Sequence, residues 1–393
     1  MSLPRDVERP LGGSLPSTPI QNPHGTPRCS YAVPARVYAV ACVTPLLLGW
    51  TILGPNAAST GTSATAATRF PRVVPDWSTA SITTDPTALG AVAADTLTYL
   101  RAMQGSDPAA GPGIFAEIGV TEARMEATLA LVAETAAHNP AALSDPTWLT
   151  SNFYVYAWTP DPADPRVAKW KLASGEIRLT RYLTTMAEGV RTPDATHTQA
   201  LYADPGEPWR STYTRARIMA GAYVTGPAAD RATPLAWLAE NDVHDAIMQG
   251  SAAVHFPDGT THTYGVDVSN GIPYVAAHSG RAQDRYWYFK ERPDGPRGWG
   301  PPGSPDIGLK AGVSVAGDVY NLGLGRLILL DYPEGSRTRL KLAVLADSGG
   351  AFQPNLCQLD WYGGAYPSHD ALYAAWKDLP EHVHASVLVA KER

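Results

Sequence analysis

Residues 342–366, LAVLADSGGAFQPNLCQLDWYGGAY, decide the fold predicted for this chain. Two short apolar runs in this stretch, each typical of a strand, lead to an aspartate, Asp347 after the first and Asp360 after the second. Glycine pairs follow, Gly349-Gly350 and Gly363-Gly364, and in strands such glycines indicate bulges or a close backbone approach. A carboxylate at the end of a strand, beside glycines and aromatic residues, is well placed to face a ligand. Either aspartate alone could equally cap a turn or lie on the surface.

A third stretch, VSVAGDVYNLGLGRLILL at 313–330, adds Asp318 in a similar pattern of strand and glycine. Three aspartates on three such units resemble the C-terminal domain of the membrane-bound lytic murein transglycosylase A family, named for three aspartates in a double-psi β-barrel. Upstream, three more segments resemble that family in its order: QGSAAVHFPDG from Gln249, NGIPY from Asn270 and RYWYFKERPDGPRG from Arg285. The resemblance covers about residues 176–393.

This resemblance implies a mainly β fold with N-terminal helices, in which a double-psi β-barrel carries an inserted smaller β-domain. Gln353-Pro354-Asn355 stands where the family usually has lysine and glycine, so the chain looks like a divergent member. In chain order we predict a disordered tail (1–36), a signal peptide or membrane anchor (37–59), a linker (60–75), a helical segment with the first barrel strands (76–190), the inserted β-domain (191–284) and the rest of the barrel with the three aspartates (285–393).

The N-terminal prediction depends on the run from Val37 to Leu53, which is almost wholly apolar. Arg28 and Arg36 precede it and small residues follow, which is the layout of an export signal. Pro45 interrupts the run, which is shorter than the roughly 20 residues of a spanning helix, so a cleaved signal and an anchor both stay open. We expect an exported protein of the periplasm or cell envelope that reaches a membrane only through this segment.

The composition narrows the function further. The 393 residues are 44% hydrophobic and 17% charged, as in globular proteins, and a net charge of -6 without any basic block argues against a nucleic-acid partner. Eleven tryptophans and 18 tyrosines against 6 phenylalanines suit the faces of sugar rings. Of the three cysteines only Cys357 follows the export signal, so we expect no internal disulfide. No Cys/His spacing indicates a metal, and no cofactor is expected.

Local patterns predict several elements. Asp85-Pro86 and Thr121 each begin an amphipathic helix, and alternation predicts strands at 152–158 and 176–182. We interpret 235–248 as a short helix that presents Gln249 at its end.

The resemblance implies a peptidoglycan lytic transglycosylase, a carbon–oxygen lyase that cleaves the MurNAc–GlcNAc β-1,4 bond without water and leaves 1,6-anhydromuramic acid ends. Asp360 would be the catalytic acid and then the base, which requires a raised pKa. Asp347 and Asp318 would support it. We expect the glycan strand to contact polar and aromatic side chains: Tyr182, Gln249, Ser251, Asn270, Tyr274, Trp361 and Tyr362.

Two other classes stay open. A non-catalytic cell-wall polysaccharide-binding protein on the same fold stays open because of the changes after Gly350, whereas the retention of Asp360 supports the enzyme. The Asp347-Ser348-Gly349 sequence also resembles an aspartic protease, which needs two carboxylates that share a proton. Only one such motif is present, so that reading is the weaker of the two.

Overall fold

The computed structural model describes residues 65–275, 277–352 and 354–392. The predicted tail and export signal, and the first part of the linker, lie outside these residues. The rest of the predicted linker is folded instead, with helix α1 at Ala66–Arg69 and strand β1 at Arg72–Val73. Phe70 explains this difference, because its ring is buried against Phe115 and Trp158 at centroid distances of 4.5 and 5.5 Å.

Six strands close into a barrel, in the order β4–β13–β10–β12–β11–β14 and back to β4. The pairs β4–β13 and β10–β12 are parallel and the other pairs are antiparallel. The predicted fold class, mainly β with a double-psi barrel, is confirmed. The barrel strands are β4 (Glu176–Glu188), β10 (Ser314–Ala316), β11 (Leu327–Glu334), β12 (Arg337–Asp347), β13 (Gln358–Tyr366) and β14 (His382–Ala390).

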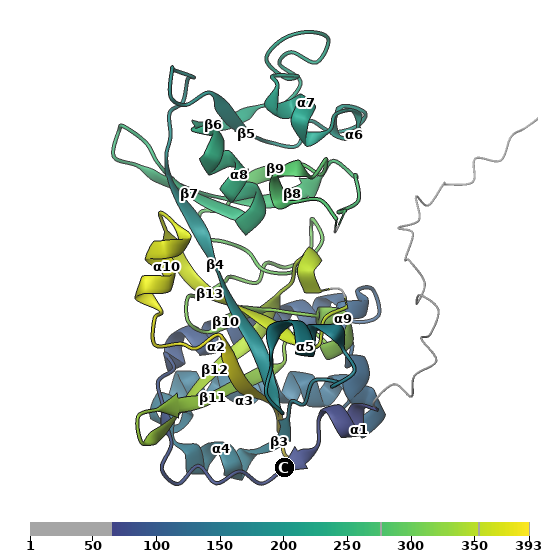
Figure 1. The fold of residues 1–393 in the computed structure, drawn as a ribbon, viewed down its shortest axis with the longest axis vertical. Helices are drawn as coiled ribbons and strands as arrows, with labels where there is room; N and C mark the ends of the chain where they lie inside the picture. The colour runs from purple at the N-terminus through teal and green to yellow at the C-terminus, as the bar shows by residue number, and fades with distance from the viewer. Residues whose placement is uncertain (1–64, 276, 353, 393) are drawn as a thin grey trace, which may run out of the picture. The chain divides into compact units, whose positions relative to one another are not determined.

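Helices from the N-terminal part cover the barrel (Figure 1). Helix α2 (Pro86–Met103) packs on α3 (Glu122–His138), and these two also contact β12 and β14, respectively. Both predicted caps are present, because the Asp85 carboxylate accepts from two backbone amides and the Thr121 hydroxyl accepts from one. The apolar stripes of these helices and the barrel strands form the first core.

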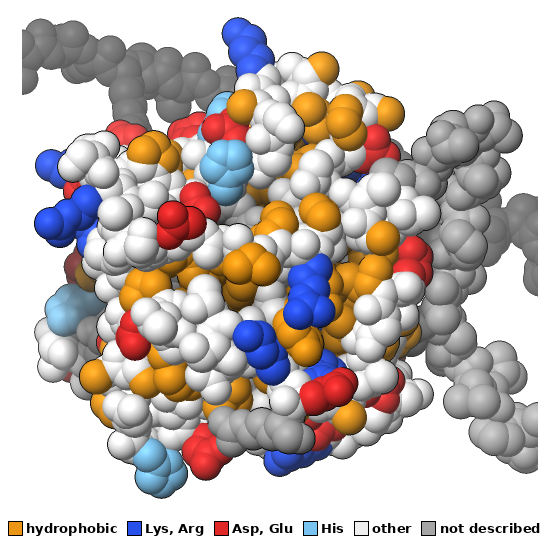
Figure 2. Space-filling view, turned by 90° about the horizontal axis from the view of Figure 1, so that it is seen from below, with side chains coloured by type: hydrophobic (Ala, Val, Ile, Leu, Met, Phe, Trp, Pro, Cys, Tyr) orange, Lys and Arg blue, Asp and Glu red, His pale blue; other side chains and the backbone are white. Residues whose placement is uncertain are grey.

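The remaining short elements of this part are β2 (Ser81–Ile82), α4 (Pro146–Asn152), β3 (Phe153–Ala157), α5 (Pro165–Trp170), α9 (Val319–Leu322) and α10 (His369–Ala375), with 3-10 turns at Pro108–Ala110, Gly113–Ile118, Pro140–Ser144 and Gly350–Phe352; a further 3-10 turn, Gly280–Ala282, lies in the inserted domain. The face in Figure 2 mixes exposed hydrophobic and basic side chains. None of the helices that the structure describes is long and apolar enough to cross a bilayer.

A second core belongs to the inserted domain and takes residues from Ala187 to Phe289. Strand β4 is long enough to pair with barrel strands along most of its length and with β7 at its end, so it connects the two cores (Figure 1). The elements of the insert are β5 (Gln199–Tyr202), α6 (Trp209–Thr212), α7 (Arg215–Met219), β6 (Pro234–Leu238), α8 (Glu240–Gln249), β7 (Ser251–His255), β8 (Thr261–Ser269) and β9 (Trp287–Glu291).

Two sequence predictions for the insert need correction. The insert continues past Asp284, because Tyr286, Tyr288 and Phe289 are buried in its core and β9 pairs with β8. The stretch 235–248 is not one helix: its first residues form β6, which pairs with β5, and α8 begins only at Glu240. Sheet pairing across the chain outweighs the local helical pattern at Leu235–Leu238.

Candidate active site

Strands β4 and β13 build one polar face of the barrel. They run parallel, with Thr180 opposite Asp360 and Tyr182 opposite Tyr362. Because successive side chains of a strand point to opposite faces, these four side chains lie on the same side of the sheet. The tyrosine rings pack together at a centroid distance of 5.2 Å. Leu179, Leu359 and Trp361, each next to one of these residues in its strand, point to the opposite side of the sheet and belong to the first core.

Asp347 joins this face from the end of β12. It and Asp360 lie on either side of β10, where Ala316 is the register partner of both. The Tyr182 hydroxyl donates to Asp347 Oδ2 at 3.0 Å, and the Ser348 amide donates to Oδ1 at 2.8 Å. The structure therefore brings together Asp347, Asp360 and Tyr182, three residues that are far apart or on different strands in the sequence.

The surroundings of Asp360 favour a protonated carboxyl. Its Oδ1 is buried and has no hydrogen-bond donor among the described residues. Burial raises the pKa of Asp360 to about 6, although the Thr180 hydroxyl and the charges of Arg178 and Arg181 act in the opposite direction. Since part of the residue stays open to solvent, the carboxyl can exchange a proton with a bound molecule. These are the properties of a general acid that works near neutral pH.

Asp347 is also kept from ionising easily. Burial raises its pKa to about 7, and the nearby Asp360 charge adds to the rise, while the bonds from Ser348 and Tyr182 lower it. Burial and the two carboxylates in turn raise the pKa of the Tyr182 hydroxyl well above its usual value, so Tyr182 acts here as a donor.

Asp318, the third aspartate, is fully buried and holds the neighbouring loops. It caps α9 by accepting from the backbone and side-chain nitrogens of Asn321 at 3.1 and 2.6 Å, and it accepts from the Asn355 amide at 2.8 Å. Asn355 in turn bonds to Gln358 in β13. Because Asp318 is buried, it does not contact a ligand, and its support of the catalytic residue stays a prediction.

Comparisons with known proteins were made for sequence and for structure. No protein-family model matches the chain, and no curated protein matches its sequence. Solved structures do match. The membrane-bound lytic murein transglycosylase of Agrobacterium tumefaciens is 16% identical with a TM-score of 0.53, over 81% of this chain and 94% of that one. E. coli MltA with bound chitohexaose is 19% identical with a TM-score of 0.52, over 84% and 96%.

The monoclinic form of MltA from Neisseria gonorrhoeae gives a TM-score of 0.51 at 14% identity, over 82% of this chain and 92% of that one. This chain has the fold of the lytic murein transglycosylases. The resemblance predicted from the sequence is thus confirmed for the fold, and identities below 20% agree with the prediction of a divergent member.

The predicted ligand contact of Trp361 is wrong. The side chain is fully buried in the first core, where its ring lies 5.8 Å from that of Trp376 and Lys341 Nζ lies 5.9 Å from its centre. The reason is the two-residue period of a strand, which turns Trp361 away from the face that Asp360 occupies.

The predicted ligand contact of Asn270 is also wrong, because the protein uses its whole amide. The side-chain nitrogen donates to the carbonyl oxygens of Tyr213 and Asp284, both at 3.0 Å. The side-chain oxygen accepts from the amides of Ile272 and Tyr286 at 3.3 and 3.0 Å. Asn270 is 1% exposed and therefore organises the loop before β9.

Ser251 and Tyr362 are buried as well, and both bond to Thr184. The Thr184 hydroxyl lies 2.9 Å from Ser251 Oγ and 2.8 Å from the Tyr362 hydroxyl. These two hydrogen bonds link the inserted domain to the barrel, and they use the hydroxyls that we expected to contact a ligand. Ser251 and Tyr362 therefore hold the two cores together instead of facing a ligand.

Tyr274 remains open to a ligand, and Gln249 is partly exposed although both of its amide atoms have partners in the protein. Tyr274 is 46% exposed, and its ring lies so close to Gly350 that a Cβ there would be 3.7 Å away, so it stands over the loop that follows Asp347. Gln249 lies at the end of α8 and is partly exposed. The structure adds two residues that the sequence did not suggest: Thr180, beside Asp360, and Met186, which is 48% exposed further along the same face of β4. Because alternate residues of a strand share one face, counting along β4 from Tyr182 in steps of two residues would have found both.

A stability experiment tests the environment of Asp347. Below pH 3.8, its ordinary pKa, the carboxyl is protonated in the folded and the unfolded chain alike. Between pH 3.8 and about 7 only the folded chain keeps the proton, so the free energy of unfolding falls as the pH rises through this range. At pH 8 we expect Asp347→Asn to be more stable than the wild type, with a free energy of unfolding higher by on the order of 2–4 kcal/mol. At pH 4 this advantage should be lost. Thermal unfolding across pH measures it, and a difference independent of pH would contradict the argument.

Proposed function

We propose that this protein is a lytic transglycosylase that cleaves peptidoglycan glycan strands. The observation that supports this most is Asp360, on the polar face of β4 and β13. One of its carboxyl oxygens is buried and accepts no hydrogen bond from the described residues, and burial raises its pKa to about 6. The E. coli protein of the same fold was solved with chitohexaose, a sugar chain, and we extend glycan binding to this chain. The apolar run at 37–53 supports export to the periplasm or cell envelope, by a signal or an anchor.

In the proposed reaction, Asp360 gives its proton to the oxygen that bridges the two sugars, and the bond between this oxygen and the anomeric carbon breaks. The carboxylate that remains then takes the proton of the muramic acid 6-hydroxyl, whose oxygen attacks the same anomeric carbon. Asp360 ends the cycle protonated, and neither water nor a cofactor is consumed. Burial favours the first step, because a pKa of about 6 leaves a fraction of Asp360 protonated near neutral pH.

Asp347 favours a second candidate, a hydrolase. Most glycosidases use two carboxylates, one as the acid and one as the base or nucleophile. Asp347 lies near enough to Asp360 for its pKa to respond to that charge. However, Asp347 is bound to Tyr182 and Ser348 and is itself kept protonated up to about pH 7, which makes it a poor base. We therefore assign it a supporting role, in which it fixes Tyr182 beside the catalytic carboxyl.

The aspartic-protease reading is disfavoured by the same contacts. That chemistry needs two carboxylates that share one proton. Among the described residues the hydrogen bonds of Asp347 go to Tyr182 and Ser348 and not to Asp360. A wall-binding protein without activity stays as the outcome to exclude by experiment.

Digestion of purified peptidoglycan, followed by mass spectrometry, tests the proposal. Muropeptides that end in 1,6-anhydromuramic acid are the expected products. Reducing ends would instead mean hydrolysis with Asp347 as the second carboxylate. Intact glycan that nevertheless binds the protein would mean a wall-binding function.

A kinetic prediction concerns Gln249, which connects the insert to the barrel. Its Oε1 accepts from the Leu183 amide in β4 at 3.0 Å, and its Nε2 lies 3.0 Å from His369 Nε2 in α10. Truncation to alanine removes both bonds without removing an acid. We expect Gln249→Ala to raise KM several-fold and to change kcat less, as for lost uniform binding.

Gln249→Glu is the matched control, because a carboxylate can still accept from Leu183 and from His369. It should stay close to the wild type in steady-state kinetics on glycan strands. A large loss of kcat at unchanged KM in the alanine variant would mean that this segment acts in the transition state.

A further inference from the structure

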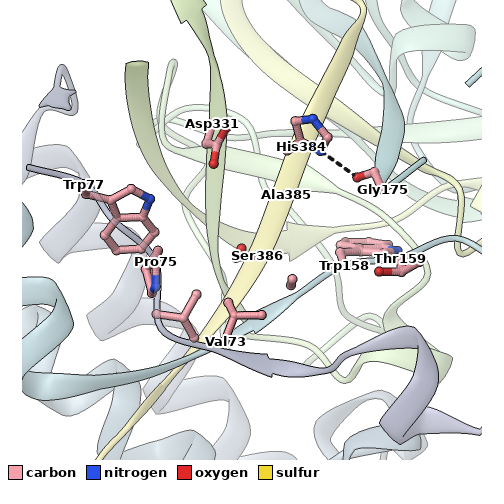
Figure 3. Close-up of a pocket in the computed structure, with 12 residues that line it drawn as sticks. Val73, Pro75, Trp77, Trp158, Thr159, Gly175, Asp331, His384, Ala385 and Ser386 are labelled. Atoms are coloured by element: carbon pink, nitrogen blue, oxygen red, sulfur yellow. Dashed lines mark hydrogen bonds between the residues drawn. The ribbon is translucent and has the colours of Figure 1, made fainter. Parts of the chain in front are cut away.

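A cavity of about 190 Å³ lies outside the active-site face, between β1, β3, β11 and β14. None of its lining residues belongs to the candidate active site. Figure 3 shows Asp331 and His384 at one end, Trp77 at one side, and Trp158 with Thr159 across from it. The cavity has no part in the proposed reaction.

The barrel register creates the polar end of this cavity. In the antiparallel pair β11–β14, Asp331 is opposite His384 and Leu329 is opposite Ser386. His384 and Ser386 are two positions apart, so their side chains lie on one side of the strand. Asp331 is half-buried between the buried Leu330 and Tyr332, an unusual place for a carboxylate.

The polar groups at this end are mostly acceptors. His384 Nδ1 lies 3.1 Å from the Gly175 carbonyl, which can only accept, so Nδ1 carries a proton, and Nε2 is an acceptor when the ring is neutral. Among the residues that the structure describes, the Asp331 carboxyl takes part in no hydrogen bond or ion pair. Burial raises the pKa of Asp331, and the charge that His384 carries when it is protonated lowers it.

The other walls are apolar. Val73, Pro75 and Val155 line the cavity together with the indoles of Trp77 and Trp158. Trp77 is buried, and its indole lies at one side of the cavity. An aliphatic chain fits such walls, and an indole also attracts a cation.

We propose that this cavity binds the side-chain ammonium of a diamino acid, as carried by the peptide stems of peptidoglycan. An ammonium offers three donors to Asp331, His384 Nε2 and the Ser386 hydroxyl, and its aliphatic stem lies along Trp77. The ammonium follows from the cavity alone, whereas the peptide stem rests on the proposed function. Such a site would hold the stem of a strand whose sugars occupy the active-site face.

A titration of the full chain tests this, with tryptophan fluorescence or NMR as the readout. The probe is the stem peptide Ala–γ-Glu–Lys amide, and its control is the same peptide with norleucine in place of lysine. We expect saturable binding of the lysine peptide and about tenfold or more weaker binding of the norleucine peptide, since a charge-assisted bond is lost. Asp331→Asn should weaken the lysine peptide to the same degree.

The variant Asp360→Asn separates this site from the active site, because it should bind the lysine peptide like the wild type. Equal binding of the two peptides, or full binding by Asp331→Asn, would overturn the proposal. Equal affinity for Nα-acetyl-lysine amide would overturn the assignment to a peptide stem. His384→Gln, which keeps a donor toward Gly175, serves as the second variant if Asp331→Asn does not fold, and it should weaken binding several-fold.

Discussion

Replacement of Asp360 by asparagine is expected to lower kcat by about 10²–10⁴-fold or more while the fold survives. An amide has nearly the size and shape of the carboxyl, but it cannot give a proton to the bridging oxygen and later recover one from the 6-hydroxyl. Since one residue performs both transfers in the proposed reaction, both are lost together. The fold should survive because the Asp360 side chain makes no hydrogen bond at Oδ1 that the amide would break. Release of anhydromuropeptides from peptidoglycan measures the loss.

Asp370→Asn is the matched control, because Asp370 is an exposed aspartate in the first turn of α10. It changes the charge of the chain in the same way and should leave turnover unchanged. Unfolding temperatures of both variants exclude a loss of fold as the cause. Retention of more than about a tenth of the wild-type kcat by Asp360→Asn would assign general acid catalysis to another residue.

The strands and the places of the aspartates at their ends could be predicted from local patterns, whereas the barrel that they form was implied by the family resemblance. Alternating apolar residues require one face of each strand to be buried, and glycines after Asp347 and Asp360 indicate where the strands bend or end. Once the strands β12 and β13 are placed next to β10, the two carboxyls lie on either side of it. The caps at Asp85 and Thr121 are local in the same way.

The binding residues were predicted less well because their partners are far away in the sequence. Asn270 stands beside a glycine, as ligand-binding amides often do, but the carbonyls that satisfy it are 57 and 14 residues away. Ser251 and Tyr362 meet at Thr184, which is 67 residues from one and 178 from the other. No pattern within a segment reveals such bonds.

Trp361 is a different kind of error, because the sequence held the information. Asp360 and Trp361 are neighbours in one strand, so their side chains must point to opposite faces. If Asp360 faces the ligand, Trp361 faces the core. The prediction that both contact the glycan conflicted with the strand that it assumed.

Trp361→Ala is therefore expected to act on stability and not on binding. The side chain is fully buried against Trp376, and its removal leaves a cavity in the first core that the barrel cannot close. Large aromatic side chains in such positions contribute about 3–5 kcal/mol to the free energy of unfolding. Denaturant unfolding measures this loss.

Trp361→Phe, which keeps a ring in the core, should lose much less stability than the alanine variant and serves as the matched control. At a temperature where the variants are folded, KM for glycan strands should match that of the wild type, because no part of Trp361 reaches the polar face. A raised KM together with unchanged stability would place the indole against the substrate. That result would require the β13 strand to turn by one residue, which would also remove Asp360 from the face where Tyr182 and Asp347 lie. Because the strand cannot present both Asp360 and Trp361 to the glycan, the variants at these two positions test the same orientation of β13.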